Sequence, residues 1–222
     1  MHVVYCMTRN LYDDFRKTVK SLYKTNDDIT LHVICEDDAI DGIEADFIKI
    51  DPRRYFSLPN YRFTLFACAR LLAPTLIDAD RVIYLDVDTI VCDSLLPLWE
   101  LDLDGYYFAA VPEHGNYNPF FRPLYFNAGV MVMNLKLMRE DGIADKLIEA
   151  INKGRYRYGE QDAINHFCYS KVKPLPTRYN VSLCTGIDSE PAIVHFAGIY
   201  HWQKGDIPFH EYRDLYFPPP QL

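Results

Sequence analysis

Two carboxylates stand directly after an apolar run at residues 82–85, where Asp86-Val87-Asp88 follows Val-Ile-Tyr-Leu. The run combines β-branched, aromatic and aliphatic residues without a polar break, which is typical of a buried strand. Two acids at the end of such a strand lose hydration and repel each other unless a cation joins them. A divalent metal ion is the usual cation, and a metal between carboxylates and a diphosphate suggests nucleotide-sugar chemistry.

The Asp-Xaa-Asp spacing is not specific by itself, because it also occurs at residues 78–80 and 102–104. The first of these copies separates an expected helix from the strand, and the second is followed by glycine, so both are typical of solvated turns. Only the pair at Asp86 and Asp88 closes a buried run. On spacing alone, a metal site and a solvated acidic turn remain open for this pair.

The bulk composition favours a folded enzyme-sized domain and excludes some partners. The 222 residues, 49% of them hydrophobic, suit one large α/β domain or two closely packed halves. A net charge of -8 argues against general nucleic-acid binding, which needs a basic face. We find no apolar run near the roughly 20 residues of a membrane span, and no signal-peptide pattern.

The six cysteines are scattered and form no Cys-Xaa-Xaa-Cys pair. Most stand among apolar residues, as in Val33-Ile34-Cys35. This pattern favours small buried thiols in a reducing compartment over a disulfide framework or a zinc site. We therefore expect a cytoplasmic protein.

The first half of the chain alternates strand and helix patterns. We expect strands over residues 2–7, 31–35, 47–50 and 82–85, and helices over 11–24 and 60–77. This order predicts a mainly parallel, doubly wound sheet, in which ligands gather outside the carboxyl ends of the strands. Asp86 and Asp88 follow one such end, and residues 8–10 follow another.

The second half is less regular. We expect strands over residues 106–111, 126–135 and 194–196, helices over 137–152 and 160–169, and an aromatic loop over 113–125. The ending Phe-Pro-Pro-Pro at 217–220 cannot continue a helix or a central strand, and predicts an extended tail or linker.

Six segments in order resemble the motifs of the retaining glycosyltransferases of family eight. They are Ala69-Arg70-Leu71, Leu85-Asp86-Val87-Asp88-Thr89, Phe126-Asn127-Ala128-Gly129-Val130 with Asn134-Leu135, Glu160-Gln161-Asp162, Leu175-Pro176-Thr177-Arg178-Tyr179-Asn180 and His195-Phe196-Ala197-Gly198. The resemblance implies a GT-A fold, which is a Rossmann-like α/β fold with a mixed, mainly parallel sheet flanked by helices. It also implies transfer of a hexose from a UDP-sugar to a glycan or other hydroxyl acceptor.

The resemblance further implies one GT-A domain over residues 1–217. Its nucleotide-binding half would cover about 1–105 and its acceptor half about 106–217. Residues 218–222 would form the extended tail, which could lead to a further domain.

By the same resemblance, Asp86 and Asp88 hold a divalent metal, with His195 as the third protein ligand. Manganese is the usual ion in the family, and magnesium is an alternative. Hard carboxylate oxygens with one imidazole suit manganese, and donor phosphate oxygens would fill the open positions. For His195 taken alone, a hydrogen-bonded core histidine is the alternative.

The resemblance implies a set of donor-binding residues: Thr8, Asn10, Tyr12, Arg70, Asp86, Val87, Asn127, Gly129 and Gly198. A Tyr12 ring can stack on uracil, but it could instead pack beside Phe15 on a helix. Arg70 would reach a phosphate or the donor sugar, unless it is a solvated helix arginine.

The Asn127–Gly129 segment resembles the family's sugar-contacting turn. Glycine permits close backbone approach, while the Asn127 amide can donate to and accept from hydroxyls. An ordinary start of a strand is the alternative for this segment.

Glu160 and Gln161 fall where the family places groups beside the transferred sugar, and both are candidate catalytic residues. Glu160 replaces the family's aspartate. The Gln161 carbonyl could stabilise an oxocarbenium-like state, although an amide is a poor nucleophile. We therefore favour front-face transfer over a covalent glycosyl-enzyme, and expect Asp162 to cap or support its helix.

The clearest departure from the family follows Gly198. His201 stands where the family has lysine, and Lys204 lies three residues further on. Either side chain could contact the donor diphosphate.

Two alternatives to an active transferase stay open. A binding protein could retain the fold and bind UDP-sugar while transferring weakly, which the departure at His201 allows. A haloacid dehalogenase-type phosphatase also places Asp-Xaa-Asp after an apolar strand, but usually after the first strand and with Thr or Val where this chain has Ile90.

Overall fold

The computed structural model describes residues 1–58, 64–114, 124–154, 156–198 and 208–215. The candidate phosphate-binding residues His201 and Lys204, the predicted tail 218–222 and most of the aromatic loop lie outside these described residues.

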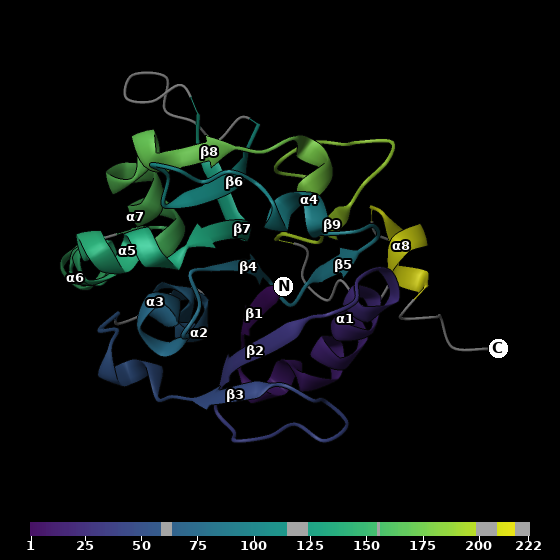
Figure 1. The fold of residues 1–222 in the computed structure, drawn as a ribbon, viewed down its shortest axis with the longest axis horizontal. Coiled ribbons are helices and arrows are strands. Elements are labelled where there is room, and N and C mark those ends of the chain that lie inside the picture. The colour runs from purple at the N-terminus through teal and green to yellow at the C-terminus, as the bar shows by residue number, and fades with distance from the viewer. Residues whose placement is uncertain (59–63, 115–123, 155, 199–207, 216–222) are drawn as a thin grey trace.

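A seven-stranded sheet in the order β3-β2-β1-β4-β7-β6-β8 forms the centre of the fold (Figure 1). Its strands are β1 (His2–Cys6), β2 (Thr30–Cys35), β3 (Asp46–Lys49), β4 (Arg81–Leu85), β6 (Phe108–Pro112), β7 (Phe126–Asn134) and β8 (Val172–Pro174). The pairs β1–β2, β2–β3, β1–β4 and β6–β8 are parallel, whereas β7 is antiparallel to both β4 and β6. The prediction of a mixed, mainly parallel sheet is confirmed.

The reversed direction of β7 has a local consequence for the candidate site. Its first residues, Phe126 to Gly129, lie at the same edge of the sheet as the carboxyl end of β4, where Leu85 pairs with Val130. A second, two-stranded antiparallel sheet of β5 (Thr89–Val91) and β9 (Ile193–His195) lies just beyond this edge, with Thr89 paired to His195. Segments from both halves of the chain therefore meet there.

Helices cover both faces of the main sheet (Figure 1). One face carries α2 (Leu65–Cys68), α3 (Ala73–Leu76), α5 (Leu135–Asp141), α6 (Ile143–Lys153) and α7 (Glu160–Phe167); the other carries α1 (Tyr12–Thr25) and α4 (Leu96–Trp99). Residues of β1 alternate between the two resulting cores, since Val4 packs in one and Val3 in the other. A short helix α8 (His210–Asp214) follows β9.

The helix expected over 60–77 differs from the observed segment. Its described part consists of α2, a 3-10 turn at Ala69–Leu72 and α3, and Pro74 lies in the last turn as expected. The helix expected over 137–152 is two helices, because Gly142 adopts a left-handed conformation with φ 59° that ends α5. The short strands β5 and β8 were not predicted.

None of the described helices combines the length and the apolar character that crossing a membrane requires. The six cysteines are free, and four of them are buried, namely Cys6, Cys35, Cys68 and Cys168.

Candidate metal centre and donor site

The turn after β4 presents the two carboxylates of the Asp-Xaa-Asp pair. The backbone N–H of Asp86 donates to the carbonyl of Gly129 at 2.8 Å, and the Thr89 hydroxyl donates to the carbonyl of Asp86 at 2.7 Å. The Thr18 hydroxyl of α1 donates to the carbonyl of Val87, also at 2.7 Å. The turn is therefore held from β7, from β5 and from α1.

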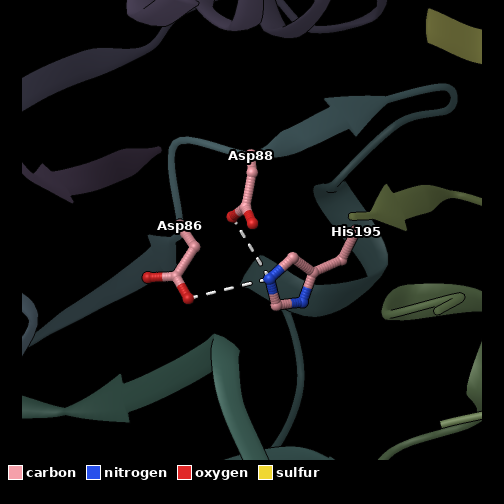
Figure 2. Close-up of side chains that lie close together, drawn as sticks. All are labelled: Asp86, Asp88 and His195. Carbon is pink, nitrogen blue, oxygen red and sulfur yellow. Dashed lines mark ion pairs between the residues drawn. The ribbon is translucent and has the colours of Figure 1, made fainter. Parts of the chain in front are cut away.

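His195, at the end of β9, faces both carboxylates (Figure 2). Its Nε2 lies 3.3 Å from Oδ1 of Asp88 and 3.7 Å from Oδ2 of Asp86. One ligand atom from each of the three residues lies within 4.8 Å of the others, which is the size of a metal-binding cluster. The fold thus brings together the three residues that the sequence assigned to the metal.

The electrostatics of this group favour a cation. Burial opposes charge on the His195 ring, but the adjacent Asp88 and Asp86 carboxylates outweigh burial and raise the pKa of His195. Burial likewise opposes charge on Asp88, but the charge and hydrogen bond of His195 lower the pKa of Asp88. The two carboxylates therefore favour positive charge on the His195 ring beside them.

The donor set fits a divalent metal. Two carboxylates supply hard oxygens, and the imidazole supplies one nitrogen whose position is fixed by a second hydrogen bond from its other ring atom. Three protein ligands leave coordination positions for a substrate. Burial alone would fit the alternative of a core histidine, but that alternative does not explain why the His195 ring is directed at two acids.

Gly129 lies against the metal group, which consists of Asp86, Asp88 and His195, and a side chain at this position would clash with the group. A β-carbon at this position would lie 2.1 Å from Cε1 of His195 and 2.8 Å from Oδ2 of Asp86. At this glycine we expected the backbone to approach a sugar closely. The structure shows that its missing side chain makes room for two of the candidate ligands.

Arg70 is buried, so the alternative of a solvated helix arginine is wrong. Its Nη2 lies 2.9 Å from Oδ1 of Asp86 and 3.3 Å from Oε1 of Glu160, and its guanidinium stands 4.1 Å from the centre of the Tyr84 ring. Nε donates to the carbonyl of Ala67 at 2.7 Å, and Nη1 donates to the carbonyl of Ala128. Burial opposes the charge, but Asp86, Tyr84 and Glu160 raise the pKa of Arg70 well above its usual range.

Tyr84 was not singled out from the sequence beyond its place in the strand. Its hydroxyl donates to Oδ1 of Asp86 at 2.5 Å. Burial raises the pKa of Tyr84, against the opposing effect of Arg70. Tyr84 and Arg70 therefore both hold Oδ1 of Asp86, while Oδ2 faces His195.

The side chain of Gln161, in the first turn of α7, is held by three groups. Its Oε1 accepts from the N–H of Ala128 at 2.9 Å, and its Nε2 donates to Oε1 of Glu113 at 3.1 Å and to the Tyr125 hydroxyl at 3.2 Å. Glu160, beside it, is buried against Arg70, and Sγ of Cys68 donates to its Oε2 at 3.4 Å.

Asp162 supports the start of α7, as expected. Its Oδ2 accepts from the N–H of Tyr158 at 2.8 Å, and its Oδ1 accepts from the Tyr125 hydroxyl at 2.5 Å. Burial, followed by this hydrogen bond to Asp162, raises the pKa of Tyr125.

Asn127 is buried at the start of β7, where its Nδ2 donates to Oε1 of Glu113 at 2.7 Å. No role was expected for Glu113, and Asn180 was expected only as part of the Leu175–Asn180 family motif. Both are buried next to Asn127, since Nδ2 of Asn180 donates to Oδ1 of Asn127 at 2.8 Å. No local pattern could assign these contacts to Glu113 and Asn180, because their partners lie in other segments of the chain.

The residues after β1 lie at the same sheet edge as the end of β4, because β1 and β4 are parallel neighbours. The Thr8 hydroxyl donates to Oδ1 of the exposed Asn10. The Tyr12 ring packs against the core on the α1 face, as its packing alternative expected. Gly198, two residues after Phe196, is exposed in a turn with φ 73°.

Comparison with known proteins identifies one family over nearly the whole chain. Residues 2–204 match the sequence profile described as glycosyl transferase family 8. General stress protein A of Bacillus subtilis is 28% identical over 79% of this chain and 72% of its own length. Glycosyltransferase GlyB of Streptococcus pneumoniae is 25% identical over 93% of this chain, which spans about half (54%) of that relative.

Solved structures share the fold. An active-site mutant of LgtC superimposes with a TM-score of 0.82 at 23% identity, covering 97% of this chain and 95% of that one. Glycosyltransferase GlyE of Streptococcus pneumoniae gives a TM-score of 0.74 at 24% identity, over 98% of this chain and 60% of its own. These neighbours have the GT-A fold, and the present architecture is of that type.

Proposed function

Because this chain belongs to glycosyl transferase family 8, we propose that it transfers a hexose from a UDP-sugar to a hydroxyl of a glycan or similar acceptor, with retention at the anomeric carbon. The observation that supports this proposal is the cluster of Asp86, Asp88 and His195 at the carboxyl edge of the sheet. LgtC, whose fold is similar, has been solved with donor and acceptor sugar analogues.

Asp86, Asp88 and His195 would hold Mn²⁺, or Mg²⁺ in its place. Bound there, the ion would neutralise charge on the departing diphosphate. Arg70 and Tyr84 fix Oδ1 of Asp86, which leaves Oδ2 on the side of His195 as the metal-facing oxygen.

The remaining candidate residues divide between the nucleotide and the sugar. We assign Thr8, Asn10, Tyr12 and Val87 to the nucleotide side, because they follow or flank the carboxyl ends of β1 and β4. Asn127, Gly129 and Gly198 stay assigned to the donor. His201 and Lys204 are the candidate cations for the diphosphate, on the family pattern alone.

Gln161 is the candidate catalytic residue beside the sugar, and its held geometry supports that assignment. Its Nε2 and Oε1 are already engaged with Glu113, Tyr125 and Ala128, so the amide is orientated before a donor arrives. Glu160 would act through Arg70, which it contacts, as a positioning residue. An amide held in this way is suited to stabilise developing positive charge by its oxygen rather than to attack, which favours front-face transfer.

The test is turnover of a panel of UDP-sugars with Mn²⁺, Mg²⁺ or excess chelator, following UDP release and the anomeric configuration of the product. We expect metal-dependent release and a retained configuration. Asp86→Asn and Asp88→Asn should each lower kcat/KM by about 100-fold or more, since several kcal/mol of charge stabilisation depend on the ion.

Asp104→Asn is the matched control, because Asp104 belongs to an exposed Asp-Xaa-Asp pair outside the site. It should turn over like wild type. Full activity in chelator, or in Asp86→Asn, would contradict the metal assignment. UDP binding without turnover across the panel would instead support the weakly transferring binding protein. Family membership leaves the phosphatase alternative without support.

A further inference from the structure

A chain of buried polar side chains runs from the metal group into the protein. Nδ1 of His195 lies 2.9 Å from Oδ1 of Asn180, Nδ2 of Asn180 lies 2.8 Å from Oδ1 of Asn127, and Nδ2 of Asn127 lies 2.7 Å from Oε1 of Glu113. All four side chains belong to buried residues, with Asn180 fully buried and His195 3% exposed. Their hydrogen-bonding directions therefore depend on one another and not on bulk water.

The direction of this chain is fixed by groups that cannot reverse. The backbone N–H of Gly129 donates to the Asn127 side chain at 2.9 Å, so the atom that it meets must be the amide oxygen. The other end of the Asn127 amide faces the Glu113 carboxylate, which accepts from the amide nitrogen. Asn127 thus has a single orientation.

Asn180 inherits its orientation from Asn127. The atom that faces Oδ1 of Asn127 must donate, so it is Nδ2, and Oδ1 of Asn180 then faces His195. The reverse orientation would place two acceptor oxygens against each other in a dry interior, which costs about 1–3 kcal/mol. Because Oδ1 can only accept, Nδ1 of His195 must carry the proton.

We propose that Asn180 is a positioning residue that holds His195 in its Nδ1–H form and directs the Nε2 lone pair at the metal. Glu113 and Asn127 keep Asn180 in the orientation that this requires. The inference deepens the proposed function and rests on its metal site. It gives Asn180 a task beyond its backbone contacts, which are a donated bond to the carbonyl of Thr177 and an accepted bond from the Thr185 hydroxyl.

Two substitutions separate positioning from packing. Asn180→Asp keeps an acceptor for Nδ1 of His195 but loses the donor to Asn127, whereas Asn180→Leu loses both. If Asn180 only links or packs the segments, the two variants should behave alike. If it positions the ring, only the leucine variant should lose metal affinity.

The measurement is Mn²⁺ affinity without any donor, from the signal of the free ion in electron paramagnetic resonance. We expect Asn180→Leu to weaken Mn²⁺ binding by about 10–100-fold, the usual effect of removing the partner of a ligating histidine, and Asn180→Asp to stay close to wild type. Asn26→Leu is the matched control. Asn26 is also a buried asparagine, bonded to Leu95 and Leu22 away from the site, so this change should lower stability and leave Mn²⁺ affinity unchanged.

A second measurement needs no variant that could fail to fold. In wild-type protein with ¹⁵N-labelled histidine and saturating Mg²⁺, the imidazole nitrogens of His195 should show a protonated Nδ1 and an unprotonated Nε2. The opposite assignment would overturn the inference. So would wild-type Mn²⁺ affinity in Asn180→Leu, or an equal loss in both Asn180 variants. Absence of Mn²⁺ binding by the wild-type protein, or unchanged binding in Asp86→Asn, would overturn the metal site itself.

Discussion

Arg70 shows how a single residue can organise the centre without facing solvent. Arg70 is 3% exposed, and its guanidinium contacts two acids, two backbone carbonyls and an aromatic ring. A buried charge is tolerated only when its partners are placed in this way, and removal of one partner of such a cluster typically costs about 3–5 kcal/mol. Because the buried positive charge of Arg70 requires a carboxylate beside it, Arg70 holds Asp86 in position.

Gly129→Ala is the sharpest residue-scale prediction. Gly129 does not have a positive φ, so alanine is compatible with its backbone, and the whole effect comes from the new methyl group against His195 and Asp86. We expect the displaced ligands to weaken Mn²⁺ binding by about 100-fold, since a shift of about 1 Å in a site has effects of that size. The measurement is Mn²⁺ titration beside thermal unfolding.

Gly105→Ala serves as the control for this prediction. No atom lies within 4 Å of a β-carbon there, but φ is +73°, so alanine should cost about 1 kcal/mol of stability and nothing in metal binding. Unchanged Mn²⁺ affinity in Gly129→Ala would show that the ligands can move aside without loss.

The sequence could predict the three residues of the candidate metal group, Asp86, Asp88 and His195, but not the residues that hold them in place. Asp86 and Asp88 stand out because two acids follow an apolar run, and His195 because it lies in a family motif. Glu113 has no such signal, and the motif that contains Asn180 does not indicate its contact with His195, since each acts through a partner brought near only by the fold. Gly129 was singled out for a close approach, but the group that approaches is His195, about 66 positions further on.

At the scale of elements, helix α1 supports the metal turn, which is the Asp86–Asp88 segment between β4 and β5. Thr18 donates to the carbonyl of Val87 at 2.7 Å, and the Ser21 hydroxyl accepts from the N–H of Val91 at 3.0 Å. Both side chains are fully buried one turn apart on the helix face that contacts β5. The turn that carries Asp88 is thus fixed to a helix and not only to its flanking strands.

We expect Thr18→Val to loosen this turn. Valine has the same shape but cannot donate, so the buried carbonyl of Val87 loses its bond and the protein loses about 1 kcal/mol. Metal affinity should fall several-fold in parallel, which chemical denaturation and Mn²⁺ titration would measure together.

Thr25→Val is the comparison on the same helix, because the Thr25 hydroxyl bonds within the helix, to the carbonyl of Ser21, and not to the metal turn. It should leave metal affinity at the wild-type value. A Thr18→Val protein with reduced stability but full Mn²⁺ affinity would show that β4 and β5 alone fix the turn.

The elements that periodicity predicted well are those with long apolar faces. Strands β1 to β4 and helix α1 were expected within one or two residues of their bounds. The strand β5 was missed because it has only three residues and owes its conformation to pairing with β9, about 100 positions away. The break at Gly142 was missed although the apolar spacing changes there, since Met138 and Ile143 are five residues apart and one continuous helix face repeats every three or four.

At the scale of the whole molecule, a second group of titratable side chains lies at the opposite edge of the sheet. Nδ1 of His2 lies 2.9 Å from Nε2 of His32 with the rings stacked, and Nδ1 of His32 lies 3.3 Å from Oδ2 of Asp46. Burial has the largest effect on His32 and lowers its pKa. The Asp46 carboxylate opposes this with a smaller effect, and His2 lowers the pKa further. The pKa of His2 is also lowered, first by burial and then by the N-terminal ammonium.

These shifts predict a loss of stability toward acid. A histidine whose folded pKa lies below the ordinary 6.5 binds its proton more readily when unfolded, so its contribution is complete above pH 6.5 and declines as the pH falls below that value. The melting temperature should therefore drop between about pH 7.5 and about pH 5.5. His32→Gln should reduce the size of this drop.

His210→Gln provides the reference, since the His210 side chain is 54% exposed on α8. Its melting temperature should follow the wild-type dependence on pH. Identical pH dependence in wild type and His32→Gln would place the acid sensitivity elsewhere in the molecule.

The metal group joins parts of the chain that are far apart, because about 100 residues separate Asp88 from His195. A cation bound by both acts as a reversible cross-link, and a covalent link across a loop of that length restricts the unfolded ensemble by about 4–5 kcal/mol in the chain-entropy model. Since the unfolded chain offers no preformed site, binding free energy becomes folding free energy. If the proposed metal binds, its depletion would then expose the chain to proteolysis as well as stop the proposed transfer, so the supply of metal would govern how long the protein persists.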